Sequence, residues 1–179
     1  SVLSLLFAPS FLILIHYFEF KVVVLAYLFL STIFLIYQFL LYKISKKIIL
    51  PTLYIALLTT AYLFNNLNVV KLISVFMSMS FLALFIDSFI NKREIILNLT
   101  KRFYKKEMSF EEEEFLKNAD GFWVVVTAIS TLILFVLVFS ENDILWAMYS
   151  SIGWYIFFGL SLLVQIIYGR LYAIQMYSR

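Results

Sequence analysis

The chain has 179 residues, of which 64% are hydrophobic, 20% aromatic and 14% charged, with a net charge of +3. Soluble domains are roughly half apolar and about 25% charged, so this composition excludes a soluble globular domain and indicates an integral membrane protein. Cysteine is absent, which excludes disulfides, thiolate metal sites and cysteine nucleophiles. We expect one membrane domain over residues 1–179, without a separate soluble catalytic domain.

Six apolar runs predict six transmembrane helices. A helix needs about 17–25 apolar residues to cross a bilayer, and each run approaches or meets that length. The first run contains Pro9, and a kink there is tolerated when neighbouring helices supply hydrogen bonds. A secretory signal peptide is the rival interpretation, but this run lacks a basic leading segment and a small-residue cleavage site. The predicted spans are residues 2–18, 22–42, 48–64, 69–90, 121–140 and 144–168.

Residues 91–120 are the only long polar stretch between these runs and carry seven of the fourteen Lys and Arg residues. Ile95, Ile96, Leu99 and Phe103 recur at helical spacing, which predicts an amphipathic helix lying in the headgroup layer. The segment Ser109-Phe110-Glu111-Glu112 fits a capping box, in which Ser109 and Glu112 bond the free N–H groups of a new helix. We expect that helix to continue into the fifth span.

The distribution of basic residues predicts the orientation. If both termini, the connection after the second span and residues 91–120 share one side, that side carries twelve Lys and Arg residues, and the other carries only Lys21 and Lys71. By the positive-inside rule the basic side is cytoplasmic. The sequence therefore predicts an all-α polytopic membrane protein with six spans, a cytoplasmic interfacial helix and both termini in the cytoplasm.

Three polar side chains within predicted spans are candidate site residues, namely Asp87, Gln38 and Gln165. Asp87 is about one turn from the cytoplasmic end of the fourth span, at a depth where Arg170 of the sixth span is a possible partner. Carboxylates inside membranes are costly and tend to be paired or functional, so a structural ion pair and a role in lipid or proton handling both stay open. Gln38 and Gln165 favour hydrogen bonds between helices, or a polar ligand path together with Asp87.

Two further groups are candidate binding residues. Lys101, Arg102, Lys105 and Lys106 would meet an acidic lipid headgroup, a phosphate or an acidic partner such as an acyl carrier protein, although a basic helix also serves simply as an anchor. Aromatic residues of the sixth span would line a helix–helix or lipid-facing groove, or form an interface belt. They are Trp146, Tyr149 and Trp154.

No catalytic signature appears. The chain lacks a Walker loop, HExxH, GxSxG and a glycine-rich dinucleotide fingerprint, and it has only four glycines. His16 is the only histidine, and one imidazole does not make a metal site. We therefore predict no catalytic residue, no metal, no cofactor and no nucleic-acid partner.

The C-terminal half resembles two families of small bacterial inner-membrane proteins. The stretch from Leu145 to Tyr149, with Tyr155 and Gly159, is similar to the last span of an uncharacterised family encoded in acyl-lipid and aryl-polyene biosynthesis clusters. Trp146, Tyr149 and Gly153 also resemble a pattern of the intracellular septation protein A family. Gln165 departs from the first family, whose members usually carry a Glu near that place. The resemblance implies an inner-membrane protein with a role in the cell envelope, and it transfers no catalytic residue.

Three functional hypotheses follow. The leading one is a non-enzymatic bacterial inner-membrane protein of cell-envelope or lipid biogenesis, which holds a lipid-like acyl product or a partner protein at the cytoplasmic leaflet. A small transporter or flippase is the alternative, and it predicts that Asp87, Gln38 and Gln165 converge in space. The third is an accessory subunit of a larger membrane complex.

Overall fold

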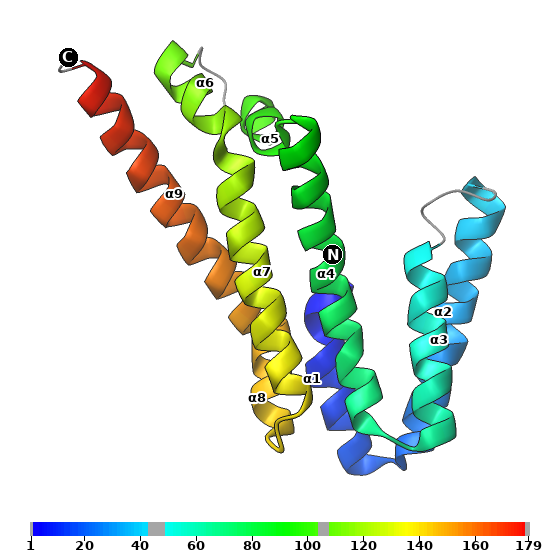
Figure 1. Cartoon of the computed structure of the whole chain (residues 1–179). Helices are drawn as coiled ribbons and strands as arrows, with labels where there is room; N and C mark the ends of the chain where they lie inside the picture. Colours follow the sequence, from blue (N-terminus) through cyan, green and yellow to red (C-terminus); the bar gives the residue numbers. More distant parts are fainter. Residues whose placement is uncertain (1, 43–48, 104–107, 178–179) are drawn as a thin grey trace. The chain divides into compact units, whose positions relative to one another are not determined.

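The structure is a computed structural model that describes residues 2–42, 49–103 and 108–177, and every regular element in these ranges is a helix (Figure 1). The prediction of an all-α fold is confirmed. The helices are α1 (Val2–Tyr17), α2 (Phe20–Tyr42), α3 (Ile49–Phe64), α4 (Leu67–Asn91), α5 (Ile95–Phe103), α6 (Phe110–Lys117), α7 (Ala119–Val138), α8 (Asp143–Met148), the π-helix η2 (Tyr149–Gly153) and α9 (Trp154–Tyr177).

Among the residues that the structure describes, four helical segments are long and apolar enough to cross a membrane: Phe20–Leu41, Leu67–Asn91, Phe110–Val138 and Asp143–Leu171. Helices α1 and α3 have 16 residues each. At 1.5 Å per residue each is about 24 Å long, which is less than the roughly 30 Å of a bilayer core. Length and composition thus indicate a membrane protein, and the first and third predicted spans are the two that fall short.

The predicted boundaries agree with the helices to within a few residues at most ends. The expected turn at Glu19 to Lys21 is shorter than predicted, because α2 already begins at Phe20. Asn65 has a φ of 49°, a left-handed conformation that Asn adopts more readily than most residues, and it directly follows the last residue of α3. The capping box at Ser109 and Glu112 is confirmed by both reciprocal hydrogen bonds.

The helices form two units. Unit 1 comprises Ser1–Phe76 and Leu134–Ser151, and unit 2 comprises Met77–Ile133 and Ile152–Arg179. The boundaries fall inside α4, α7 and η2, so each of these helices contributes residues to both units.

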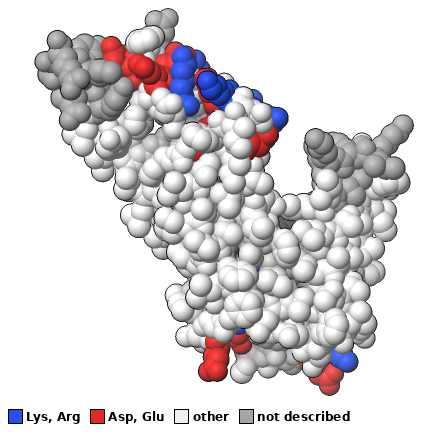
Figure 2. All heavy atoms as spheres, in the orientation of Figure 1, with Lys and Arg blue, Asp and Glu red and all other residues white. Residues whose placement is uncertain are grey.

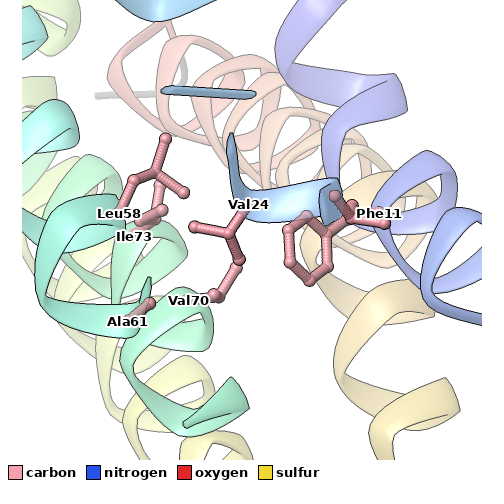
Figure 3. Packing of buried hydrophobic residues seen from close by; sticks show 7 residues of the cluster. Phe11, Val24, Leu58, Ala61, Val70 and Ile73 are labelled. Atoms are coloured by element: carbon pink, nitrogen blue, oxygen red, sulfur yellow. The ribbon is translucent and has the colours of Figure 1, made fainter. Parts of the chain in front are cut away.

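Unit 1 is held together by a small apolar core drawn from α1, α2, α3 and the first half of α4 (Figure 3). Phe11 and Val24 are fully buried, and the Phe11 ring lies 5.4 Å from the Tyr27 ring. The two helices α2 and α3 pack along each other, and α1 packs against α8. The remaining buried members of the core are Val23, Leu58, Ala61, Val70 and Ile73.

Lys71, on the first half of α4, is the most enclosed cation that the structure describes, with 1% of its side chain exposed. Its ammonium donates to the Ser140 carbonyl at 2.9 Å and lies 2.7 Å from an Asp143 carboxylate oxygen. The Asp143 side chain is 42% exposed. A buried ammonium needs such an anion, so this pair joins the start of α4 to the loop between α7 and α8 within unit 1.

Replacing Asp143 with Asn should destabilise the protein, because the buried Lys71 ammonium loses its counter-charge. We expect a lower melting temperature in detergent, equivalent to about 1–3 kcal/mol, since the exposed side of Asp143 limits the strength of the pair. Lys71→Met combined with Asp143→Asn should recover most of this loss. Lys21→Met is the control, because Lys21 is exposed and lies over the Tyr62 ring at 5.7 Å. An unchanged melting temperature in Asp143→Asn would contradict the role of the pair.

Candidate functional site

The charged residues of unit 2 gather at the end formed by α5 and α6, while the flanks of its helices are apolar on the face shown (Figure 2). Helix α5 ends on the basic pair Lys101 and Arg102, and α6 begins with the acidic run Glu111, Glu112 and Glu113. This end of unit 2 is therefore where an amphipathic ligand could meet both water and hydrocarbon.

A buried carboxylate, Asp120, fixes α5 to the rest of unit 2. Asp120 is 2% exposed and lies in the first turn of α7. Its two oxygens accept hydrogen bonds from the Ile95 and Ile96 backbone N–H groups, each at 3.1 Å, and from the Ser88 hydroxyl of α4. The first N–H groups of a helix have no partner inside the helix, and the helix dipole favours a negative charge there. Asp120 thus caps α5 from a different helix and links α4, α5 and α7.

The turn between α4 and α5 has an unusual backbone. Lys92 and Glu94 have φ values of 49° and 51°, in the left-handed region that residues with side chains seldom adopt. Each such residue costs about 1 kcal/mol or more, and persists where the surroundings fix it. The Asp120 contacts to Ile95 and Ile96 directly follow the turn and provide that fixation.

Asp87 pairs with Arg93, which corrects the partner suggested by the sequence. A carboxylate oxygen of Asp87 lies 2.8 Å from the Arg93 guanidinium, and the other accepts from the Asn91 amide at 2.7 Å. The left-handed turn brings Arg93 back beside the last turn of α4, so Arg170 of α9 is not needed as a counter-charge. Because both side chains are more than 40% exposed, this is a surface ion pair of small energy.

The basic residues of α5 are partly neutralised by α6. Lys101 lies 2.8 Å from a Glu113 carboxylate oxygen, and Lys117 lies 4.0 Å from the same oxygen. Arg102 is exposed. Two further members of the predicted basic set, Lys105 and Lys106, lie outside the described residues. The apolar side of α5 packs on the protein, since Leu97 is 2% exposed and Ile95 and Ile96 contact the cluster around Trp123.

Helix α6 packs closely on α9 at a glycine. A Cβ atom at Gly169 would lie 2.9 Å from Cε1 of Phe115, a distance that side chains do not tolerate. The Phe115 ring also lies 6.1 Å from the Tyr168 ring. The absence of a side chain at Gly169 therefore allows the close approach of the two helices.

A pocket of about 530 Å³ lies beside this contact, between α6, the start of α7 and α9. Its volume is within the roughly 300–1,000 Å³ typical of small-molecule sites, and most of its lining is hydrophobic, as in such sites. The polar groups Glu114 and Asn118 belong to α6 and its C-cap, and Gln165 and Tyr168 belong to α9. The other lining residues are Phe115, Ala119, Phe122 and Val164.

Gln165 is the buried polar residue of this pocket, with 6% of its surface exposed. Its side-chain oxygen accepts from the Trp123 indole N–H at 2.6 Å. An indole nitrogen only donates, so this bond assigns the oxygen of Gln165 to Trp123 and leaves the NH₂ group as the free donor. Within the described part of the chain, no protein group accepts from that NH₂ group.

Stacked aromatic rings support Trp123 from both sides. The Phe85 ring of α4 lies 5.8 Å from the Trp123 ring, and the Phe158 ring of α9 lies 5.6 Å from it. Trp154 in turn packs against Phe158 at 4.5 Å. Trp154 and Phe158 both belong to α9, and the Trp154 ring also lies 5.5 Å from the Phe81 ring of α4, so the predicted aromatic residue Trp154 links α9 to α4.

The remaining predicted site residues lie in unit 1 or at the surface. Trp146 is fully buried, and its indole N–H has no hydrogen-bond partner among the residues that the structure describes. Tyr149 is partly buried in η2, and Gln38 is partly buried in α2. Arg170 is exposed on α9. Asp87 and Gln165 are not joined, because each has its own partner, Arg93 and Trp123 respectively.

In residues 2–42, 49–103 and 108–177 no group of three His, Asp or Glu side chains is placed to hold a metal ion. No protein-family model, curated protein or solved structure matches the chain. The family resemblance of the C-terminal half therefore stays a prediction, and the site is interpreted from its own residues.

Sequence reasoning identified Gln165 but missed Asp120 and Trp123. Asp120 lies directly before an apolar run, where an acidic residue is common because the helix dipole favours it. Nothing in the local sequence indicates that its oxygens bond the start of another helix. The sequence indicated even less about Trp123. It lies near the end of a span, where Trp is frequent because its amphipathic ring suits the membrane–water interface.

Asp120→Ala should release α5, because the Ile96 N–H group and the Ser88 hydroxyl lose their acceptor and the Ile95 N–H group keeps only its longer bond to the Ser88 oxygen, at 3.3 Å. Unsatisfied buried donors cost about 1–3 kcal/mol each, so local opening should become frequent. We expect the amides of residues 95–98 to exchange hydrogen at least about tenfold faster. Asp87→Ala, which removes an exposed carboxylate near the C-terminal end of α4, is the control and should leave these rates nearly unchanged. Equal protection in Asp120→Ala would show that α5 is held by its apolar contacts alone.

Proposed function

We propose that this chain is a non-enzymatic bacterial inner-membrane protein of cell-envelope or lipid biogenesis, which holds a lipid-like acyl compound at the cytoplasmic leaflet. The observation that carries the proposal is the pocket between α6, α7 and α9, with aromatic and aliphatic walls and a free amide donor at Gln165.

The lining suits an amphipathic molecule. On α6 and α7, Phe115, Ala119 and Phe122 recur at helical spacing and form an apolar stripe, and Val164 faces them from α9. An acyl chain would lie along these residues, since burial of each CH₂ group contributes about 0.8 kcal/mol. Its polar end would lie between Gln165 and the water-exposed Glu114 and Asn118. Because α6 carries four glutamates, this end of the pocket belongs at the membrane surface.

Orientation and partners complete the proposal. The excess of basic residues on one side favours six spans with both termini and the α5–α6 end in the cytoplasm. Membrane lipids would be the immediate partners, and the exposed Arg102, together with Lys105 and Lys106, would meet acidic headgroups or an acidic carrier protein. The resemblance to inner-membrane proteins of acyl-lipid gene clusters and of septation supports the same assignment.

Native mass spectrometry of the protein, released gently from its own membrane, tests this function. We expect one copurifying amphiphile per chain, lost in Val164→Trp, because the indole would occupy the pocket from its lipid-exposed wall. Val164 is 56% exposed, so the variant should fold. Val136→Trp introduces the same side chain at a position of α7 that is 67% exposed and outside the pocket lining, and it should keep the amphiphile.

Two outcomes of this experiment would overturn the proposal. One is retention of the same amphiphile by Val164→Trp, which would place the ligand elsewhere. The other is a protein bound at fixed stoichiometry with no amphiphile, which would indicate an accessory subunit.

A further inference from the structure

We infer that the pocket selects acyl compounds with an uncharged ester or amide head over free fatty-acid anions. This inference rests on the proposed function and adds the chemical class of the ligand. It follows from the buried amide donor that Gln165 offers in the pocket and from the charge at its mouth.

The donor is the NH₂ group of Gln165. Trp123 holds the side-chain oxygen at 2.6 Å, and the aromatic stack of Phe85, Trp123 and Phe158 prevents the indole from turning away. A neutral amide N–H bonds an ester or amide carbonyl oxygen well without a counter-charge. It does not supply the positive charge that a carboxylate needs when it leaves water.

The charge at the mouth is negative. Glu114 is the only charged side chain that lines the described pocket, and it is exposed. Its carboxylate would repel an anionic head and would leave an uncharged one unaffected. The nearby cation Lys117 is directed to Glu113, at 4.0 Å.

Arg170 does not neutralise the negative charge at the mouth of the pocket. It is two residues after Tyr168 and five after Gln165 on α9. At 3.6 residues per turn it is rotated by about 200° and about 140° from them around the helix axis, away from the face that lines the pocket. A pocket for fatty-acid anions or phosphates would place a guanidinium or ammonium where Gln165 and Tyr168 stand.

The test compares monomyristoylglycerol with myristate, which share an acyl chain and differ in the charge of the head. Each is titrated into the purified full chain in one detergent near pH 8, and the bound fraction is measured by native mass spectrometry. We expect monomyristoylglycerol to bind at least about tenfold more tightly, which corresponds to one charge-sensitive contact. Glu114→Lys, a change on the surface, should reduce this preference to about twofold or reverse it.

The contribution of Gln165 requires a variant that leaves no buried donor unpaired. Gln165→Leu alone strands the Trp123 N–H and could unfold the site, so Gln165→Leu is combined with Trp123→Phe. This pair should weaken monomyristoylglycerol binding by about five- to tenfold, the usual effect of one hydrogen bond, and change myristate binding little. Gln38→Leu on α2, which replaces another partly buried glutamine outside the pocket, is the control and should bind as the original chain does.

The outcomes separate the two proposals. Equal or tighter binding of myristate, with binding of both blocked by Val164→Trp, would overturn the inference about the head and leave the lipid-holding function standing. The same holds if Glu114→Lys leaves the preference unchanged. Failure of Val164→Trp to reduce binding of either compound, or no binding at all, would overturn both.

Discussion

The carboxylate of Asp120 is the interaction on which the arrangement of unit 2 depends. It is enclosed by protein, and hydrogen bonds from the Ser88 hydroxyl and two backbone N–H groups at the start of α5 replace its bonds to water. Hydrogen bonds to a charged group contribute about 1.5–3 kcal/mol each, and their sum offsets the cost of burying the charge. The bonds that hold the first residues of α5 help to fix the preceding turn, which contains the two left-handed residues Lys92 and Glu94.

One turn of α7 connects this anchor with the pocket. Asp120 bonds the start of α5, Ala119 and Phe122 line the pocket, and Trp123 bonds Gln165. These residues lie on different faces of the same turn, so a displacement of α7 at this point would move the anchor and the donor together. The basic and acidic surfaces of α5 and α6 are therefore placed at a fixed distance from the pocket by the same backbone segment. The first turn of α7 thus positions both the charged surface of α5 and the pocket proposed to bind the ligand head.

The sequence predicted the helices well because their signals are local. The apolar runs and the Ser109 capping box each depend on a few neighbouring residues, and the structure contains helices over these runs and both bonds of the capping box. Partners across helices were harder to predict. Depth in the membrane made Arg170 a possible partner of Asp87, whereas the structure pairs Asp87 with Arg93, only six residues away in the left-handed turn. The burial of Lys71 also could not be read locally, since its anion lies seventy-two residues later, at Asp143.

The hydrogen-bond and ion-pair partners of the polar side chains bear on two physical models, a protein that holds a ligand and a protein that transports ions or protons. A path for ions or protons needs groups that can exchange partners along the bundle. In the described part of unit 2, the Asp87 carboxylate is paired at the surface and Asp120 is fully satisfied by its donors. Gln165 differs, because its oxygen is fixed by Trp123 while its NH₂ group stays free at the wall of an apolar pocket. A fixed donor beside a hydrophobic surface orients one carbonyl group and does not relay a charge, which agrees with the proposed binding of an acyl compound.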